Sequence, residues 1–531
     1  MPVTPTYPGV YVEEIPSGVH TITGVPTSIT AFVGRAARGD TTDITTINSW
    51  ADFVRNFGGL DRGYPMSYGV RDFYQNGGSQ AIIVRLYKAT DGKNSVAAVT
   101  ANGLTVQAAS AGTWGNSLKV RIDTKVSSDV ATSFGLAAAD LFNLSVQDAA
   151  TGNVEKFLNL TVKESPNRAD RVLEDRSNLL RITALPANPP TAHPDPPAGK
   201  SVWDDANDPP TFSKVAAAGQ AVDSAALDAN AYLGDPVAKT GIYALQNADL
   251  FNLLCIPEDA FDTALPAGVY SAALDYCVTR RAMLLVDPPP DWSSANVITQ
   301  NNNQKLTDLA LTGDRARNAA LYFPRIDEPD PNLNNLTQTY VPCGAIAGIM
   351  ARTDNERGVW KAPAGINASL NGVTDLDVSL TDNENGQLNP LGINCLRTFP
   401  VYGSVVWGSR TLRGADIAAD EYKYVPVRRL ALYIEESLFR GTKWVVFEPN
   451  DEPLWAQIRL NIGAFMHDLF RKGAFQGQTP KDAYFVKCDK ETTTQNDINL
   501  GIVNILVGFA PLKPAEFVIL QIQQIAGAIQ T

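Results

Sequence analysis

The clearest hydrophobic pattern in the chain lies in its C-terminal part. Apolar residues recur at helical spacing over 427–438, and Gly441 follows as a stop. A second amphipathic run over 453–472 starts after Asn450 and Asp451, which are both suited to cap a helix, and ends in basic residues that favour its carbonyl end. We therefore predict two helices here. Strands are predicted at 444–447, 484–486 and 502–509.

The N-terminal part predicts a compact β-α-α-β unit. An apolar strand at 29–34 precedes a helix over 47–57, for which Ser49 is a suitable N-cap and Gly58 a stop. A short helix at 68–74 and a buried-type strand at 81–87 complete the unit.

The amino-acid composition changes between residues 92 and 235, where Ala, Ser, Thr, Asn and Asp predominate. Alternating strands are predicted at 118–122, 142–146 and 157–162. The stretch 186–210 contains eight prolines, too many for a helix or a central strand. We predict an inserted β-rich domain that carries a long surface loop.

From 236 to 350 the pattern favours a mostly parallel sheet. Apolar strands at 250–256, 283–286 and 319–323 are separated by segments long enough for helices. The fold class predicted for the whole chain is therefore multidomain, α+β and α/β.

Both ends of the chain carry β-prone runs that prolines isolate from the neighbouring sequence. The first run consists of Val10, Tyr11, Val12, Glu13 and Glu14, and the second includes Phe517, Val518, Ile519 and Leu520. Neither run has a hairpin partner nearby, so its backbone groups need partners elsewhere. Strand addition to another subunit would supply them. The alternatives are that each arm folds back on its own domain or is disordered.

Composition narrows the function. The formal net charge of −12 argues against a nucleic-acid protein, and no basic amphipathic stretch suits an anionic membrane. No export signal or long apolar segment is evident, which predicts synthesis and assembly in the cytoplasm and, for any action outside, release by lysis. The five cysteines are widely spaced, and we expect buried free thiols.

No motif predicts catalysis, a metal or a cofactor. The histidines His20, His193 and His467 lack metal-ligand spacing, and we expect all three to be exposed to solvent. Asp40 stands where a phosphate-binding loop over 32–41 would require lysine. Two acidic groups could hold a cation, but solvated carboxylates are the simpler interpretation. These groups are Asp204, Asp205 and Asp208, and Asp327, Glu328 and Asp330.

Several long motifs resemble the tail sheath proteins of contractile phages and related injection systems. The most specific is AGIMARTDNERGVWKAPA at 347–364. It is joined, in this order along the chain, by YPGVYVEEIPSG at 7–18, TSITAFVG at 27–34, FYQNGG at 73–78, VWGSRTL at 406–412, YVPVRRLALYIEESL at 424–438 and FEPNDEPLW at 447–455. The resemblance covers about 1–90 and 236–531, and leaves the insertion without a counterpart.

This resemblance implies a structural subunit of hexameric rings that stack into a helical sheath around an inner tube. The arms of neighbouring subunits would complete a shared β-sheet through Val10 to Glu14 and Phe517 to Leu520. The implied sheath-type core is built from N- and C-terminal segments. The expected domains are an arm at 1–20, a core part at 21–91, the insertion at 92–235, an α/β domain at 236–385, a C-terminal domain at 386–511 and an arm at 512–531.

Contraction is expected to be a change of packing that needs no nucleotide. Expected partners are copies of the chain, the inner tube, the baseplate and a terminator or cap, with neither nucleic acid nor membrane insertion. The residues predicted to face the tube are Arg428, Arg429, Arg459, Arg471 and Lys472, and we expect charge reversal at Arg428 and Arg429 to leave folding intact. An α/β enzyme and a secreted adhesin are the rival classes. Whether the particle is a phage tail, a bacteriocin or an injection system stays open.

Overall fold

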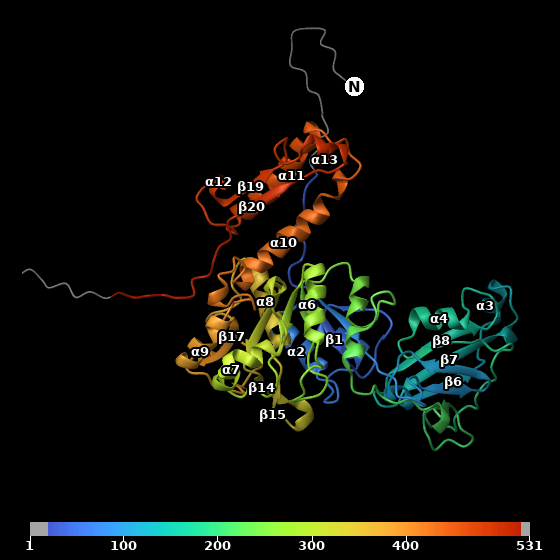
Figure 1. Ribbon diagram of the computed structural model, residues 1–531. Coiled ribbons are helices and arrows are strands. Elements are labelled where there is room, and N and C mark those ends of the chain that lie inside the picture. Colours follow the sequence, from blue (N-terminus) through green and yellow to red (C-terminus); the bar gives the residue numbers. More distant parts are fainter. Residues whose placement is uncertain (1–19, 522–531) are drawn as a thin grey trace, which may run out of the picture. The chain divides into compact units, whose positions relative to one another are not determined.

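The computed structural model describes residues 20–521, which divide into two compact units (Figure 1). The sheet unit comprises Ser28–Arg352 and Pro363–Asp420. Within the described residues, the terminal unit comprises 20–27, Thr353–Ala362 and 421–521. Helix α8 (Cys343–Arg357) begins in the sheet unit, and its last turn belongs to the terminal unit.

An eight-stranded sheet organises the sheet unit. Its strands are β1 (Thr30–Gly34), β2 (Thr45–Ile47), β3 (Ala81–Arg85), β11 (Leu253–Cys255), β12 (Met283–Val286), β13 (Ala319–Phe323), β17 (Ile393–Phe399) and β18 (Gly403–Val406). They lie in the order β18-β17-β13-β12-β11-β1-β3-β2, and only the edge strands β2 and β18 are antiparallel to their neighbours. Every residue of β1, β3, β12 and β13 is buried, as expected of parallel strands covered on both faces.

Helices flank this sheet, and capping residues next to them in the sequence mark where they begin and end. They are α1 (Trp50–Phe57), α2 (Met66–Gln75), α5 (Ala229–Leu233), α6 (Val269–Thr279), α7 (Ala295–Thr307), α8 and α9 (Asp382–Leu388). The Ser49 hydroxyl accepts a hydrogen bond from the Asp52 amide, and Gly58 ends α1 in the left-handed region, so both predicted caps are confirmed. The core joins residues of β1, β3, β11 and α6 in one cluster.

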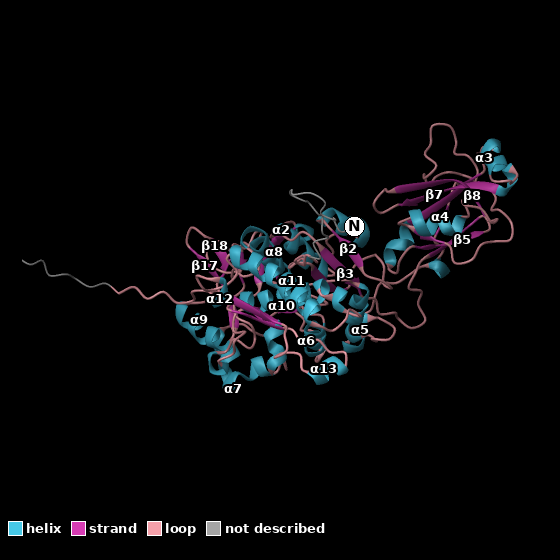
Figure 2. Ribbon diagram, turned by 90° about the horizontal axis from the view of Figure 1, so that it is seen from above, coloured by secondary structure: helices cyan, strands magenta, loops and turns pink. Residues whose placement is uncertain are grey.

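The insertion forms a β-rich body with its own core (Figure 2). Its elements are β4 (Ala98–Ala101), β5 (Leu104–Ala108), β6 (Leu118–Asp123), α3 (Ser128–Ser133), β7 (Leu141–Asp148), β8 (Val154–Thr161), α4 (Ala169–Arg176), β9 (Leu180–Arg181) and β10 (Ser213–Lys214). The strands form two sheets, β10-β6-β7-β8 and β4-β5-β9. Residues 186–210 contain neither helix nor strand, which confirms the predicted proline-rich loop.

A small fourth sheet, in the order β15-β14-β16, corrects one expectation about acidic residues. It consists of β14 (Ile326–Asp330), β15 (Leu336–Tyr340) and β16 (Asp375–Leu376). Glu328 and Asp330 are buried on β14 and pair with Arg71 and Arg62, so they are not solvated loop carboxylates. The alternation of β14, which points these side chains inward, was hidden by the acidic and proline residues around it.

The terminal unit packs helices against a two-stranded sheet. Its elements are α10 (Val425–Gly441), α11 (Glu452–Arg471), α12 (Pro480–Ala483), β19 (Tyr484–Lys487), α13 (Gln495–Asn499) and β20 (Leu506–Phe509). The Asp451 carboxylate accepts from the Leu454 amide, which confirms the cap predicted for α11. The strand predicted at 444–447 is wrong, because Lys443–Val445 is a 3-10 turn and Phe447 has a φ of 73°.

The two units cut the chain differently from the domains expected from sequence. The predicted parts 21–91 and 236–385 both contribute strands to the large sheet, as does the start of 386–511. From Glu421 onward the chain belongs to the terminal unit. A parallel sheet collects strands that are distant in sequence, and local patterns do not reveal this.

Candidate functional site

The C-terminal run that was singled out for strand exchange is exposed. Phe517, Val518, Ile519 and Leu520 keep 72–83% of their surfaces open and belong to no helix or strand. Burial of such apolar side chains is worth about 1.5–3 kcal/mol each, so their exposure in a single chain is costly. The N-terminal counterpart from Val10 to Glu14 lies outside the described residues.

The sheet of β19 and β20 has only these two strands within residues 20–521. Tyr484 pairs with Phe509, and Lys487 pairs with Leu506. The residues of β19 alternate between half-buried and exposed, and those of β20 are half-buried after the exposed Leu506. Phe485 and Leu506 are about half exposed. Two-stranded sheets are marginally stable alone, and each outer edge presents backbone groups that another strand can bond.

The residues predicted to face a tube lie on α10 and α11 in different settings. Arg471 and Lys472 are exposed, and Lys472 pairs with Asp468 at 2.6 Å. Arg428 pairs with Glu435 at 3.2 Å, and Arg459 pairs with Glu452 at 2.6 Å. Because these acids neutralise their partners, the group does not form an uncompensated basic surface, and its contact with a tube stays a prediction.

Arg429 is buried, with 4% of its side chain exposed. Its guanidinium donates to both carboxylate oxygens of Asp354, at 2.9 and 2.5 Å, and to the Thr27 carbonyl oxygen at 2.9 Å. The Thr27 hydroxyl donates to the same carboxylate at 2.6 Å. Burial raises the pKa of Asp354, and the Arg429 charge opposes this rise. Reversing Arg429 is therefore expected to destabilise the fold, in contrast to the expectation from sequence.

The carboxyl edge of the large sheet between β1 and β11 is where sheets of this kind hold ligands. Here Arg35, directly after β1, pairs with Asp259 at 2.5 Å, with 12% of each side chain exposed. Nearby, Arg325 pairs with Glu258 at 2.9 Å, and both are almost fully buried. Burial raises the pKa values of Glu258 and of Asp287, which follows β12, to about 7. Ion pairs within the chain thus occupy the crevice.

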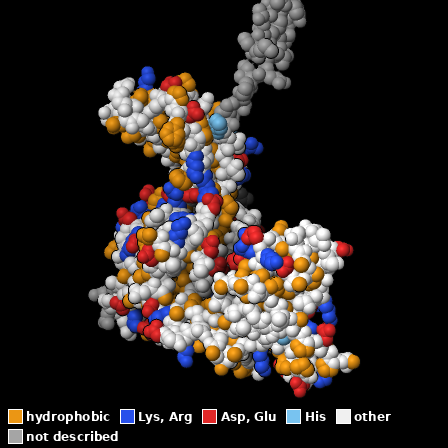
Figure 3. All heavy atoms as spheres, turned by 90° about the vertical axis from the view of Figure 1, so that its right-hand side faces the viewer, with side chains coloured by type: hydrophobic (Ala, Val, Ile, Leu, Met, Phe, Trp, Pro, Cys, Tyr) orange, Lys and Arg blue, Asp and Glu red, His pale blue; other side chains and the backbone are white. Residues whose placement is uncertain are grey.

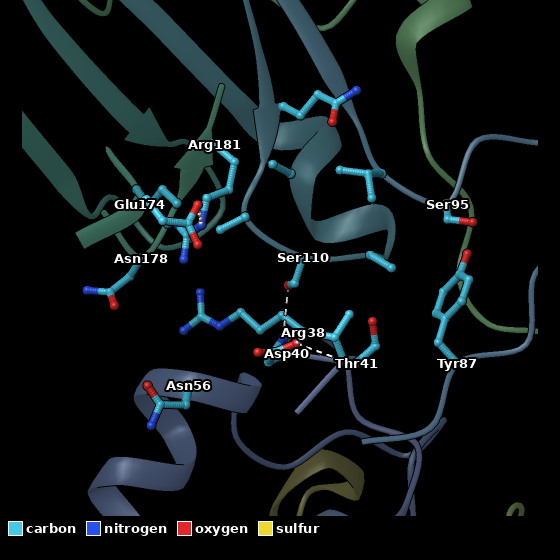
Figure 4. A pocket seen from close by; sticks show the side chains of 18 of the residues that line it. Arg38, Asp40, Thr41, Asn56, Tyr87, Ser95, Ser110, Glu174, Asn178 and Arg181 are labelled. Carbon is cyan, nitrogen blue, oxygen red and sulfur yellow. Dashed lines mark hydrogen bonds and ion pairs between the residues drawn. The ribbon is translucent and has the colours of Figure 1, made fainter. Parts of the chain in front are cut away.

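A polar cleft of about 760 Å³ lies between the loop after β1 and the insertion (Figure 4). The Gly39 amide donates to the Ser110 hydroxyl at 3.0 Å, and Asp40 accepts from the amide and hydroxyl of Thr42 at 2.7 Å. Arg85 is buried and donates to carbonyl oxygens of Ala36, Ala37, Gly39 and Ala111. The loop tested for phosphate binding is therefore a docking loop for the insertion.

The remaining candidate groups are structural. All five cysteines are free and buried, as expected from sequence. His467 is exposed and His20 stacks on Trp444, but His193 is buried: its Nδ1 accepts from the Ile122 amide and its Nε2 lies 3.0 Å from the Ser213 hydroxyl. Its expected exposure is therefore wrong.

Within residues 20–521, no cluster of three His, Cys, Asp or Glu side chains is arranged to hold a metal ion. In the same residues no helix is long and apolar enough to span a bilayer. On the face that Figure 3 shows, charged side chains of both signs are interspersed, without a continuous basic surface.

Two family models match the chain over more than half of its length. The description "Phage tail sheath protein central domain" matches residues 231–412, and "Phage tail sheath C-terminal domain" matches residues 418–525. Both matches lie in the part of the chain that carries the quoted C-terminal motifs.

Curated relatives agree with this assignment. The chain is 30% identical over 179 residues to the tail sheath protein of Vibrio phage KVP40, and 26% identical over 234 residues to that of Enterobacteria phage T4. These matches cover 33% and 43% of this chain, and 25% and 32% of the relatives, so the chain matches about a quarter to a third of their length.

Solved structures share the fold over nearly the whole chain. The sheath complex of the extracellular contractile injection system PVC, in its contracted state, has a TM-score of 0.56 at 21% identity and covers 98% of both chains. A sheath tail protein of Listeria innocua has a TM-score of 0.57 at 12% identity, covering 93% of this chain and 97% of its own. A chain of the anti-feeding prophage baseplate has a TM-score of 0.55 at 24% identity, covering 98% and 100%.

Proposed function

The chain belongs to the tail sheath protein family, and from this premise we propose that it is the structural subunit of a contractile sheath. Copies would polymerise as stacked hexameric rings around an inner tube and would contract to drive the tube through a target envelope. The observation that carries the proposal is the exposed apolar run from Phe517 to Leu520 on a chain whose β19–β20 sheet has open edges.

Strand exchange explains both features together. A terminal arm of one copy would add to the edge of β19 or β20 in another copy, so that exposed backbone groups pair and exposed apolar side chains become buried. Each backbone hydrogen bond contributes about 0.5–1.5 kcal/mol net. One arm therefore adds a few kcal/mol, and six copies in each of many rings would make the lattice durable.

Energy for contraction would come from apolar area that is buried only in the contracted lattice, at about 25 cal/mol per Å² as an upper guide. This mechanism requires no nucleotide or cofactor, and it assigns the chain a structural rather than a catalytic role. The inner tube, the baseplate and a terminator or cap are its proposed partners. Assembly would take place in the cytoplasm, for either a phage tail or an injection particle.

Assembly in vitro tests this proposal. We would compare the full chain with variants that lack residues 1–20, residues 512–531, or both, each expressed with its cognate tube protein and imaged by negative stain. The full chain should form cylinders, and the doubly truncated chain should stay monomeric with an unchanged circular dichroism spectrum.

A substitution series supports the same test. Replacing Phe517, Val518, Ile519 and Leu520 together by serine should abolish cylinders. Replacing the exposed residues Val401 and Tyr402 by serine is the matched control, because it removes exposed apolar surface at a hairpin tip and should leave assembly intact. Long cylinders from the doubly truncated chain would overturn the proposal.

A further inference from the structure

The first described residues form an extended segment that lies along α10 (Figure 1). Strand exchange alone does not require this arrangement. Ile22 packs at the C-terminal end of the helix, where a Cβ on Gly441 would lie 2.6 Å from its Cγ2. The Val25 amide donates to the Ser437 hydroxyl at 3.2 Å, and Arg429 donates to the Thr27 carbonyl. The segment therefore runs antiparallel to α10 from its last turn toward its first.

The length of this extended segment matches the length of the part of α10 that it covers. From Gly441 to Arg429 the helix rises about 18 Å at about 1.5 Å per residue, and the six extended residues from Ile22 to Thr27 span about 17 Å between their first and last Cα atoms. A Cβ on Gly24 would lie 1.9 Å from the Tyr433 hydroxyl oxygen, so a side chain at this position would have to displace the Tyr433 ring. The segment is thus fitted to the surface of α10 along most of the helix.

Buried polar contacts fasten the inner end of this segment. The Asp354 carboxylate accepts from the Thr27 hydroxyl and from both terminal nitrogens of Arg429. Asp354 and Arg429 expose 3% and 4% of their side chains. Water therefore competes little for these bonds, and the three residues form a closed latch.

The C-terminal segment is fastened at the opposite end of the same helix. The Tyr424 hydroxyl, at the N-cap of α10, donates to the Glu516 carboxylate at 2.9 Å, and the Lys423 ammonium lies 3.9 Å from it. The exposed run from Phe517 to Leu520 begins one residue later. At the other end of α10, His20 stacks on Trp444 with ring centroids 4.2 Å apart.

From these contacts we propose that α10 is a strut that carries axial force between the two arms, with Thr27, Asp354 and Arg429 as positioning residues that hold the segment 22–27 to it. The inference rests on the proposed function, because it assumes that neighbours hold the arms. His20, where the described chain begins, and Glu516 lie at opposite ends of this helix, which is about 25 Å long, so neighbours pulling on both arms would load it along its axis. A pull on the N-terminal arm would shear all contacts from Ile22 to Thr27 at once rather than peel them singly.

Hydrogen exchange in the isolated full-length chain tests the latch without any need for assembly. Thr27→Val removes the hydroxyl that donates to Asp354 and keeps the shape of the side chain. Exchange at 22–27, measured at the hydrogen-bonded Val25 amide, should become about tenfold faster, because one charge-assisted hydrogen bond is lost. The exposed Thr41→Val is the matched control and should change nothing there. Unchanged exchange at 22–27 in Thr27→Val would overturn the latch.

Assembled sheaths test the strut. Tyr424→Phe removes the hydroxyl bonded to Glu516, and Tyr402→Phe, at an exposed tyrosine, is its control. After controlled shearing, cylinders of Thr27→Val and of Tyr424→Phe should be at least twofold shorter than the wild type, whereas both controls should match it. Wild-type lengths in both strut variants would overturn the inference. Assembly of the doubly truncated chain would instead overturn the proposed function, so the two failures are distinguishable.

Discussion

At the scale of single residues, the terminal unit depends on a buried ion pair that local sequence patterns did not reveal. Arg429 lies between Val427 and Leu430 on the apolar face of α10, and this was the available signal, because a charge on such a face requires a partner. The partner, Asp354, is 75 residues away in the chain. Periodicity predicts the face of a helix but not which distant side chain meets it.

Charge reversal should therefore destabilise the fold at Arg429 but not at Arg471. Arg429→Glu would place two carboxylates together in a dry site and should lower the free energy of unfolding by about 3–5 kcal/mol. Arg471→Glu, at an exposed position on α11, should change it by less than about 1 kcal/mol. Urea titration followed by circular dichroism measures both. Equal stability of the two variants would contradict the buried latch.

Glu328 should make the fold sensitive to alkali. Its carboxylate pairs with Arg71, which also pairs with Asp72 at 2.7 Å, and burial followed by the Asp72 charge raises the pKa of Glu328 to about 9 from 4.5. The folded protein thus keeps a proton that the unfolded chain releases above about pH 4.5. Stability should fall as the pH rises toward 9, by up to about 1.4 kcal/mol per pH unit.

The matched experiment is Glu328→Gln, which holds the neutral form at every pH. Between pH 7 and 8.5 its melting temperature should fall less than that of the wild type. The raised pKa values of Glu258 and Asp287, at about 7, give both proteins the same slope at lower pH, so this window reports the joint titration of Glu328 and Asp72, whose pKa burial also raises. Parallel curves for wild type and variant would show that Glu328 titrates normally.

At the scale of elements, strong local signals were sufficient for helices and inner strands. The caps and basic end of 453–472 predicted α11 to within a residue at each end, and the apolar run 283–286 coincides with β12. The run 444–447 has the aromatic and β-branched residues of a strand, yet Val446 and Phe447 are exposed and no strand pairs with them in the described part of the chain. Composition predicts strand propensity, whereas pairing depends on what folds beside it.

The insertion should be removable. Its ends lie side by side, since the Val222 amide donates to the Asn94 carbonyl and the Ala225 amide to the Lys88 carbonyl. Its core is a cluster separate from that of the large sheet. Replacing residues 95–220 by a short Gly-Ser linker should leave a monomer that melts in one cooperative transition, as measured by calorimetry. Loss of that transition would mean that the sheet needs the insertion, through contacts such as that of Arg85 with Ala111.

At the scale of the whole molecule, charge is unevenly distributed. Residues 421–531 contain twelve Lys and Arg and twelve Asp and Glu, so the full net charge of −12 is carried by the rest of the chain. Copies that meet in a lattice would repel through those acidic parts. The strands β19 and β20 and the run from Phe517 to Leu520, which we propose for strand exchange, lie in the balanced part, where association meets no such net repulsion.

Salt should therefore promote assembly. The screening length falls from about 30 Å at 0.01 M to about 8 Å at 0.15 M, which weakens repulsion between acidic surfaces. The fraction of chain that sediments as cylinders should rise over this range in ultracentrifugation. A decrease with salt would indicate that ion pairs across the interface outweigh the repulsion.

Because every thiol is buried, a single introduced cysteine can be labelled without first removing the native cysteines. Cys255, Cys277, Cys343, Cys395 and Cys488 are all buried, so a maleimide dye should not react with them in the folded protein. It should react with a cysteine introduced at the fully exposed position of Val401. One fluorophore per subunit, counted by mass spectrometry, would then report lattice spacing by energy transfer in real time, with no native residue replaced except the one that is labelled.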